Sequence, residues 1–227
     1  MNAVKGPSLS LGLLLVLASC KDSDLSRADA FLQLEDWPRA IALYDQIVQA
    51  NPLQPEPRMG LALARAGAER ESSNSGLDSA TDWLSVARDF AIVERLDTNL
   101  STSNDRADAL FHAALCWQRD GHLPQAKHAA EDAQALHARH APSAQYLGTL
   151  ARSEGDQASA ERWFTRAISV DSSYLPAWAS LGELARDEGD PEAAILYWEE
   201  ALKRNPKHPW FLKMVAQVRD SLGLVKR

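Results

Sequence analysis

The sequence repeats itself at intervals of 34 residues, and this period constrains the fold more than any other feature of the chain. Glycine and alanine return at the same offset across the second half: Gly148, Ala160 and Ala167 correspond to Gly182, Ala194 and Ala201. Self-similarity at a period of this size indicates an array of small stacked units, each burying its apolar face against its neighbours.

The residues inside each period resemble the tetratricopeptide repeat (TPR). Residues 175–208 carry the pattern of that family most fully: Trp178, Leu181-Gly182, Ala194, Trp198, Ala201 and Pro206. Residues 141–174 match nearly as well, and residues 107–140 and 21–54 match less closely. The resemblance implies an all-α fold, a TPR-type α-solenoid of antiparallel helix pairs that ends in a C-terminal capping helix.

The resemblance also divides the chain into segments. The solenoid is expected over residues 20–222, with a short tail at 223–227. Its expected parts are repeats at about 21–54, 55–106, 107–140, 141–174 and 175–208, and a capping helix at 209–222.

Small residues fall where the two helices of one unit would touch, as with Gly182 on the first helix and Ala194 on the second. Bulky side chains there would push the helix axes beyond their usual separation of about 8–10 Å. The dipeptides Gly155-Asp156 and Gly189-Asp190 are predicted to form turns. Glycine would supply the left-handed residue that ends one helix, and aspartate would cap the next.

One unit breaks the period. Ala62 and Ala114 occupy equivalent positions but lie 52 residues apart, which places an insertion of 18 residues within 68–106. Glu71–Gly76 is predicted to be a flexible loop, Thr81–Leu96 a helix and Leu100–Asn104 a polar connection. The insertion is either a tolerated surface feature or a ridge that contacts a specific partner.

The N-terminus reads as a targeting segment. The apolar run 9–18 is about half the length that a membrane-spanning helix needs, which suits the core of a signal peptide. It ends in Leu17-Ala18-Ser19-Cys20, which resembles the bacterial lipobox. The resemblance implies a signal peptide at 1–19 and lipidation of Cys20. Because Lys21 rather than aspartate follows, it also implies an outer-membrane anchor facing the periplasm. The alternative is a plain signal peptide.

Composition and motifs argue against several functions. A net charge of −7 makes nucleic acid an unsuitable main partner, because phosphate binding needs a basic face. The sequence contains no phosphate-binding glycine loop, nucleophile elbow or zinc-protease motif, so no enzymatic activity and no cofactor are predicted. His137 and His140 have a spacing that can bind metal, but no Cys, Asp or Glu completes a ligand set locally and histidine is favoured near a helix C-terminus, so no metal site is predicted. Cys116 is expected to be a buried hydrophobe.

The family resemblance implies a concave face lined by the first helix of each pair. We assign the repeat positions that line this face in the family to the equivalent positions of this sequence. The predicted partner-binding residues are Met59, Leu63, Phe111, Leu115, Arg119, Arg152, Glu183 and Arg186. These positions are apolar in the N-terminal half of the solenoid and polar in its C-terminal half, which suits an amphipathic helix or an acidic tail as the ligand. Alternatively, neighbouring helices fill the apolar stripe, and acids such as Asp187 neutralise the arginines.

These features together predict a membrane-anchored scaffold or adaptor of the bacterial cell envelope. It would bind a peptide or helix of a partner protein in its groove, with the lipid anchor as its membrane contact. The alternative is a structural lipoprotein that assembles with itself and has no separate ligand.

Overall fold

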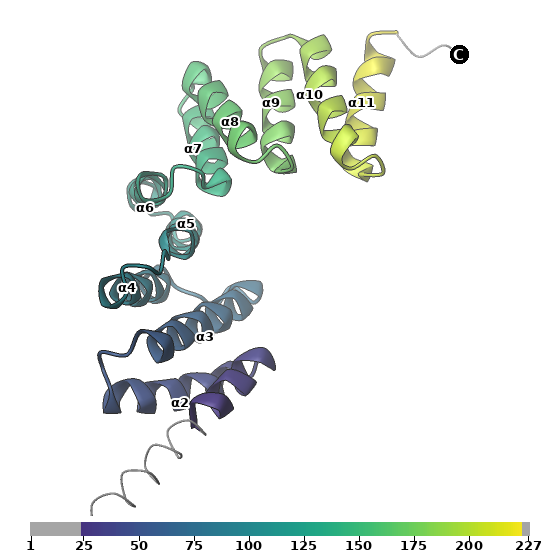
Figure 1. The fold of residues 1–227 in the computed structure, drawn as a ribbon. Helices are drawn as coiled ribbons and strands as arrows, with labels where there is room; N and C mark the ends of the chain where they lie inside the picture. The colour runs from purple at the N-terminus through teal and green to yellow at the C-terminus, as the bar shows by residue number, and fades with distance from the viewer. Residues whose placement is uncertain (1–23, 224–227) are drawn as a thin grey trace, which may run out of the picture. The chain divides into compact units, whose positions relative to one another are not determined.

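The computed structural model describes residues 24–223, and these residues form helices and turns without any strand. From α2 (Trp37–Ala50) to α4 (Ala80–Leu96) and from α6 (Leu123–Leu136) to α11 (Pro209–Ser221), each helix packs against the next one along the chain (Figure 1). The prediction of an all-α fold is therefore confirmed. The predicted signal peptide and Cys20 lie outside the described residues.

The chain divides into two compact units between Ala109 and Leu110, inside helix α5. The first unit contains a helical segment at residues 24–33 and the helices that follow it: α2 (Trp37–Ala50), α3 (Pro55–Asn74), α4 (Ala80–Leu96) and the beginning of α5 (Ser103–Arg119). Three aromatic residues are buried in its core. Tyr44 packs with Ala28, Ala40 and Leu61, and Trp83 and Phe90 of α4 are buried as well.

The second unit contains the rest of α5 and the helices that follow it: α6 (Leu123–Leu136), α7 (Ala141–Ser153), α8 (Gln157–Val170), α9 (Leu175–Asp187), α10 (Pro191–Arg204) and α11 (Pro209–Ser221). From α7 onward, each helix packs against the next (Figure 1). The helix that was expected after Pro206 is α11. Its Phe211 and Val215 are buried against α9 and α10 residues such as Trp178 and Trp198, so it covers the end of the array.

Aromatic side chains of second helices pack directly on glycines of first helices. A Cβ atom placed on Gly148 would lie 2.5 Å from the ring of Phe164, and one on Gly182 would lie 2.0 Å from Nε1 of Trp198. Real Cβ contacts are never this short. The predicted reason for the small residues, close approach of the paired helices, is therefore confirmed.

The predicted turns are confirmed as well. Gly155 and Gly189 have φ angles of 81° and 84°, and the carboxylates of Asp156 and Asp190 accept hydrogen bonds from backbone N–H groups of the following helix. The equivalent turn between residues 24–33 and α2 differs, because Glu35 takes the glycine position with a φ of 57°. A residue with a Cβ atom adopts this conformation only at an energetic cost.

The insertion folds differently from the prediction at both of its expected connections. The flexible loop expected at Glu71–Gly76 is wrong, because α3 continues to Asn74. The Ser73 hydroxyl lies 2.9 Å from the Glu69 carbonyl and 2.5 Å from the Asp78 carboxylate, so the serines that suggested a loop are used to hold the last helical turn. The predicted helix Thr81–Leu96 is confirmed as α4.

The connection after α4 is held at Thr102. Its N–H donates to Glu94 at 2.8 Å and its hydroxyl donates to the Phe90 carbonyl at 3.0 Å. Arg106 donates to the second oxygen of Glu94 at 2.6 Å. Helix α5 therefore begins at Ser103, earlier than the expected polar connection at Leu100–Asn104 would allow.

Candidate partner-binding site

The eight predicted binding residues fall in both units. Met59 and Leu63 lie on α3 in the first unit, where Met59 is half-buried and the Leu63 side chain is 38% exposed. The other six lie in the second unit, on α5, α7 and α9. Each of the two units is compact by itself.

The two apolar residues of α5 have different surroundings. Phe111 is half-buried, with its ring edge-on to His140 at 5.7 Å and to Tyr146 at 6.1 Å between centroids. It belongs to the cluster that includes Leu147 and Ala114, so part of its surface is already used in packing. Leu115, one helical turn later, is 37% exposed. Leu115 thus has the highest fractional exposure among the apolar residues of α5.

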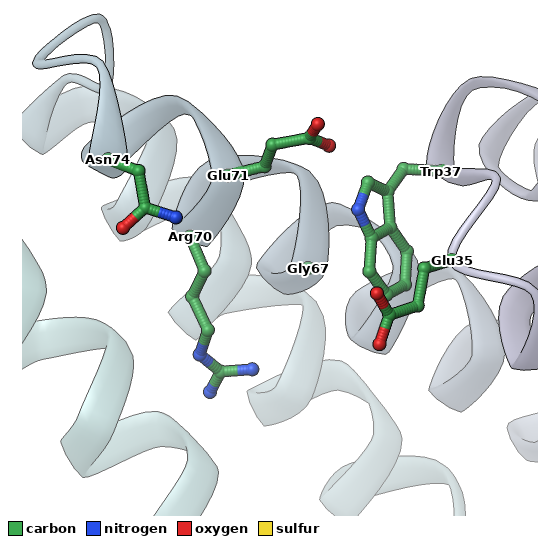
Figure 2. Close-up of a pocket in the computed structure, with 6 residues that line it drawn as sticks. All are labelled: Glu35, Trp37, Gly67, Arg70, Glu71 and Asn74. Carbon is green, nitrogen blue, oxygen red and sulfur yellow. The ribbon is translucent and has the colours of Figure 1, made fainter.

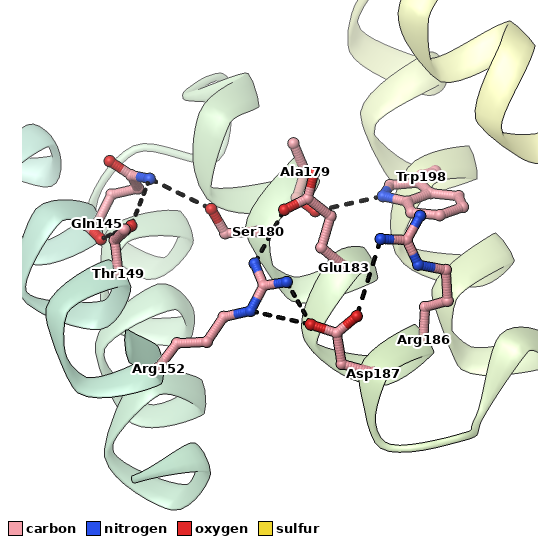
Figure 3. Close-up of polar contacts among 9 residues, drawn as sticks. All are labelled: Gln145, Thr149, Arg152, Ala179, Ser180, Glu183, Arg186, Asp187 and Trp198. Atoms are coloured by element: carbon pink, nitrogen blue, oxygen red, sulfur yellow. Dashed lines mark hydrogen bonds and ion pairs between the residues drawn. The ribbon is translucent and has the colours of Figure 1, made fainter. Parts of the chain in front are cut away.

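Polar residues at the predicted binding positions of α7 and α9 form one hydrogen-bonded network (Figure 3). The Arg152 guanidinium donates to Glu183 at 2.9 Å and to Asp187 at 3.1 Å. Burial would lower the pKa of Arg152, but the bonds to both carboxylates outweigh burial and raise it. Arg152 therefore remains charged and clamps α7 to α9.

Other groups extend this network. Gln145 of α7 donates to the Ser180 hydroxyl of α9 at 3.2 Å, and Trp198 donates to the Ala179 carbonyl at 3.3 Å (Figure 3). Arg186 is 45% exposed and lies 3.8 Å from Asp187, so its guanidinium is the more accessible one. Two guanidiniums thus face two carboxylates on this surface.

Arg119 does not occupy the repeat position that Arg152 and Arg186 share. In the 34-residue register, Gln118 is the residue equivalent to Arg152 and Arg186, and Arg119 follows it by one position. Arg119 lies near the end of α5, with its Nε atom 3.3 Å from the carboxylate of the adjacent Asp120.

The remaining residues singled out in the sequence have local structural roles. His137 ends α6, and His140 begins α7, where its buried ring accepts a hydrogen bond from the Ser143 N–H at 3.3 Å. Cys116 is 2% exposed on α5, in agreement with its expected burial. None of the helices between residues 24 and 223 is both long and apolar enough to cross a membrane.

Sequence reasoning missed a pocket in the first unit. It has a volume of about 460 Å³ and lies between the turn before α2 and the end of α3 (Figure 2). The residues that line it are Glu35, Trp37, Gly67, Arg70, Glu71 and Asn74. One signal could have identified it: Glu35 stands where the other turns have glycine, at Gly121, Gly155 and Gly189.

Comparison with protein families gives two matches, both described as tetratricopeptide repeat. They cover residues 25–72 and residues 175–218. The chain therefore carries tetratricopeptide repeats near both ends, and the predicted fold class, a TPR-type α-solenoid, is confirmed. Comparison with curated protein sequences found no match.

Several solved structures share this fold. The MamA protein is 20% identical, with a TM-score of 0.52 over 82% of this chain and 92% of that chain. Pseudomonas aeruginosa pilF is 11% identical, with a TM-score of 0.57 over 91% of this chain and 86% of that one. YrrB, described as a TPR protein with an unusual peptide-binding site, is 16% identical, with a TM-score of 0.50 over 84% and 89%. At these identities the likeness shows the fold alone.

Proposed function

We propose that this protein is a membrane-anchored scaffold of the bacterial cell envelope that binds a partner protein through the first helices of its repeats. Tetratricopeptide repeats generally mediate protein–protein interactions, and both matched segments are of this type. The fold is a protein-interaction scaffold that is not typically enzymatic. The proposed activity is therefore recruitment, without a chemical step.

The observation that carries this proposal is the exposure of Leu115. Leu115, Thr149 and Glu183 occupy equivalent positions in successive repeats, and the helices that carry them are first helices of their pairs. An exposed leucine in this column provides apolar contact area, and the accessible Arg186 guanidinium provides a charged contact. An amphipathic helix or an extended peptide with mixed charges fits this combination.

A peptide ligand is also supported by analogy. YrrB shares the fold and is described as having a peptide-binding site. The analogy concerns the class of ligand, because fold similarity by itself does not identify a partner.

The proposed localisation is based on the segment Leu17-Ala18-Ser19-Cys20. Acylation of Cys20 would anchor the chain, and because Lys21 follows, the outer membrane facing the periplasm is proposed. Two or more acyl chains hold a protein stably on a membrane, since each buried methylene contributes about 0.8 kcal/mol. Tethering would raise the local concentration of the scaffold near other envelope proteins, so that even a moderate affinity gives occupancy.

The test is cross-linked affinity purification from native membranes with the full chain and two variants. Leu115→Asp places a charge in the proposed site. Leu196→Asp is the matched control, because Leu196 is 64% exposed but lies on the second helix α10. We expect one envelope protein to be captured by the parent and the control and lost with Leu115→Asp. Equal capture by all three would contradict the proposal.

The same experiment addresses self-assembly. If the protein lost with Leu115→Asp is a second copy of this chain, the structural lipoprotein that assembles with itself replaces the scaffold. Light scattering of the parent over a range of concentrations would then show a dimer or larger species, and the Leu115→Asp variant would remain monomeric.

A further inference from the structure

The pocket in the first unit is built by features that set this unit apart from the other repeats. Helix α3 has 20 residues, whereas the equivalent helices α7 and α9 have 13 each. Arg70, Glu71 and Asn74 all lie in the extra turns, beyond the position at which α7 and α9 end. The insertion therefore forms one wall of the pocket.

Three further departures from the repeat pattern form the rest of the pocket. Glu35 replaces the turn glycine, and Trp37 stands where the other second helices begin with Leu123, Gln157 or Pro191. Gly67 stands where the other first helices have Arg119, Ser153 or Asp187. The Trp37 ring needs this glycine, because a Cβ atom at position 67 would lie 2.6 Å from it.

The charges of the pocket are unbalanced. Arg70 lines it, but its guanidinium lies 2.6 Å from the Asp108 carboxylate, which compensates its charge. No ion pair or side-chain hydrogen bond within the described part of the chain engages Glu35 or Glu71. In Figure 2 the Glu35 and Glu71 side chains lie on the side of the pocket where Trp37 stands, and Arg70 extends away from it. Two carboxylates beside an indole ring favour an organic cation.

We propose that this pocket binds an arginine side chain of a protein partner. The planar guanidinium can stack on the Trp37 ring while its N–H groups donate to Glu35 and Glu71. A volume of about 460 Å³ accommodates such a side chain. The pocket and the proposed Leu115 face share no residue, so each proposal can fail without the other.

The position of Glu35 supports the assignment. Glycine at this turn would relieve the left-handed backbone, as it does at Gly121, Gly155 and Gly189. A glutamate that keeps φ at 57° gives the pocket a carboxylate that glycine cannot supply.

The test uses the full chain labelled with ¹⁵N and follows the indole N–H signal of Trp37, which is identified by its loss in Trp37→Phe. The probes are two capped tripeptides, one with arginine between glycines and one with citrulline, which has nearly the same shape and no charge. We expect the arginine peptide to shift the Trp37 signal and the citrulline peptide to leave it unchanged. Equal shifts from both peptides would overturn the proposal.

Variants separate binding from folding. Glu35→Gln and Glu71→Gln should each weaken the arginine peptide roughly fivefold, through the lost ionic contact. Glu35→Gly should weaken it equally while unfolding no more easily than the parent, because the strained turn is relieved. Glu131→Gln, which changes an exposed residue of α6, and Leu115→Asp should leave the affinity unchanged. Unchanged affinity in both Glu35→Gln and Glu71→Gln would overturn the proposal.

Discussion

The indole of Trp198 lies directly against the backbone of Gly182, so that a Cβ atom on Gly182 would be 2.0 Å from Trp198 Nε1. The same Nε1 atom donates to the carbonyl of Ala179, at 3.3 Å, on the helix that it packs against. A fully buried aromatic group thus fixes both the separation and the rotation of α9 and α10. Phe164 packs on Gly148 in the same way in the preceding pair, without the hydrogen bond.

Gly182→Ala should therefore destabilise the protein even though alanine favours helix formation. The added methyl group overlaps the Trp198 ring, and relief of such overpacking costs typically about 1–3 kcal/mol. Urea unfolding of the parent and the variant measures the difference. As a control, the same substitution in a Trp198→Leu background should cost less, because the smaller side chain leaves room. An unchanged midpoint for the single variant would contradict the arrangement.

Arg152→Met should weaken the contact between α7 and α9. It removes the bonds to Glu183 and Asp187 and leaves these two carboxylates of α9 without their partner on α7. Because these groups are partly exposed, the expected loss of stability is about 1 kcal/mol, and it should shrink in high salt. Arg27→Met, which breaks a more exposed pair within one helix, should cost less and serves as the control. A loss that is equal in the two variants would argue against the clamp.

Glu94→Gln should reveal a pH-dependent contribution to stability. Burial raises the pKa of Glu94, but the Thr102 N–H and the Arg106 guanidinium outweigh it and hold the pKa below its usual value of 4.5. A lowered pKa means that the carboxylate stabilises the folded state above the unfolded pKa and loses this effect as the pH falls through the folded value. The variant should be roughly 1–3 kcal/mol less stable at about pH 7, with the gap closing well below about pH 4.5. Urea midpoints at several pH values measure this gap, and a pH-independent gap would contradict the assignment.

Cys20→Ala should abolish acylation of the chain. The thiol of Cys20 is the group that would accept the lipid, and alanine has no nucleophile to replace it. Radiolabelled fatty acid incorporated by the producing cells measures acylation, and partition into detergent measures anchoring. Cys116→Ala is the control, since Cys116 is buried in α5. A Cys20→Ala variant that still carries label or partitions with the membrane would contradict the lipoprotein assignment.

The sequence by itself determined the helical pairing and its turns. Period, small residues and Gly-Asp dipeptides are local features, and each has a local physical cause: the αL residue at Gly155 or Gly189, the cap at Asp156 or Asp190, and the contact at Gly182. Such features are visible in the amino-acid sequence, because they depend on residues within one repeat or on residues of the next repeat at a fixed offset.

Only the tertiary structure decided which conformation the chain adopts where the period breaks and which partners the polar side chains bind. The serines at 72–75 suggested a loop, but Ser73 bonds back to Glu69 and across to Asp78, and the helix continues. The sequence left open whether Arg152 is available to a partner or is neutralised by acids such as Asp187, and the structure shows Glu183 and Asp187 engaging it from the next first helix. The pocket of Glu35, Trp37 and Glu71 likewise joins residues more than thirty positions apart. Trp37 and Glu71 are one period of 34 residues apart, but Glu71 lies in the extra turns of α3, so only the three-dimensional packing shows that these side chains line one pocket.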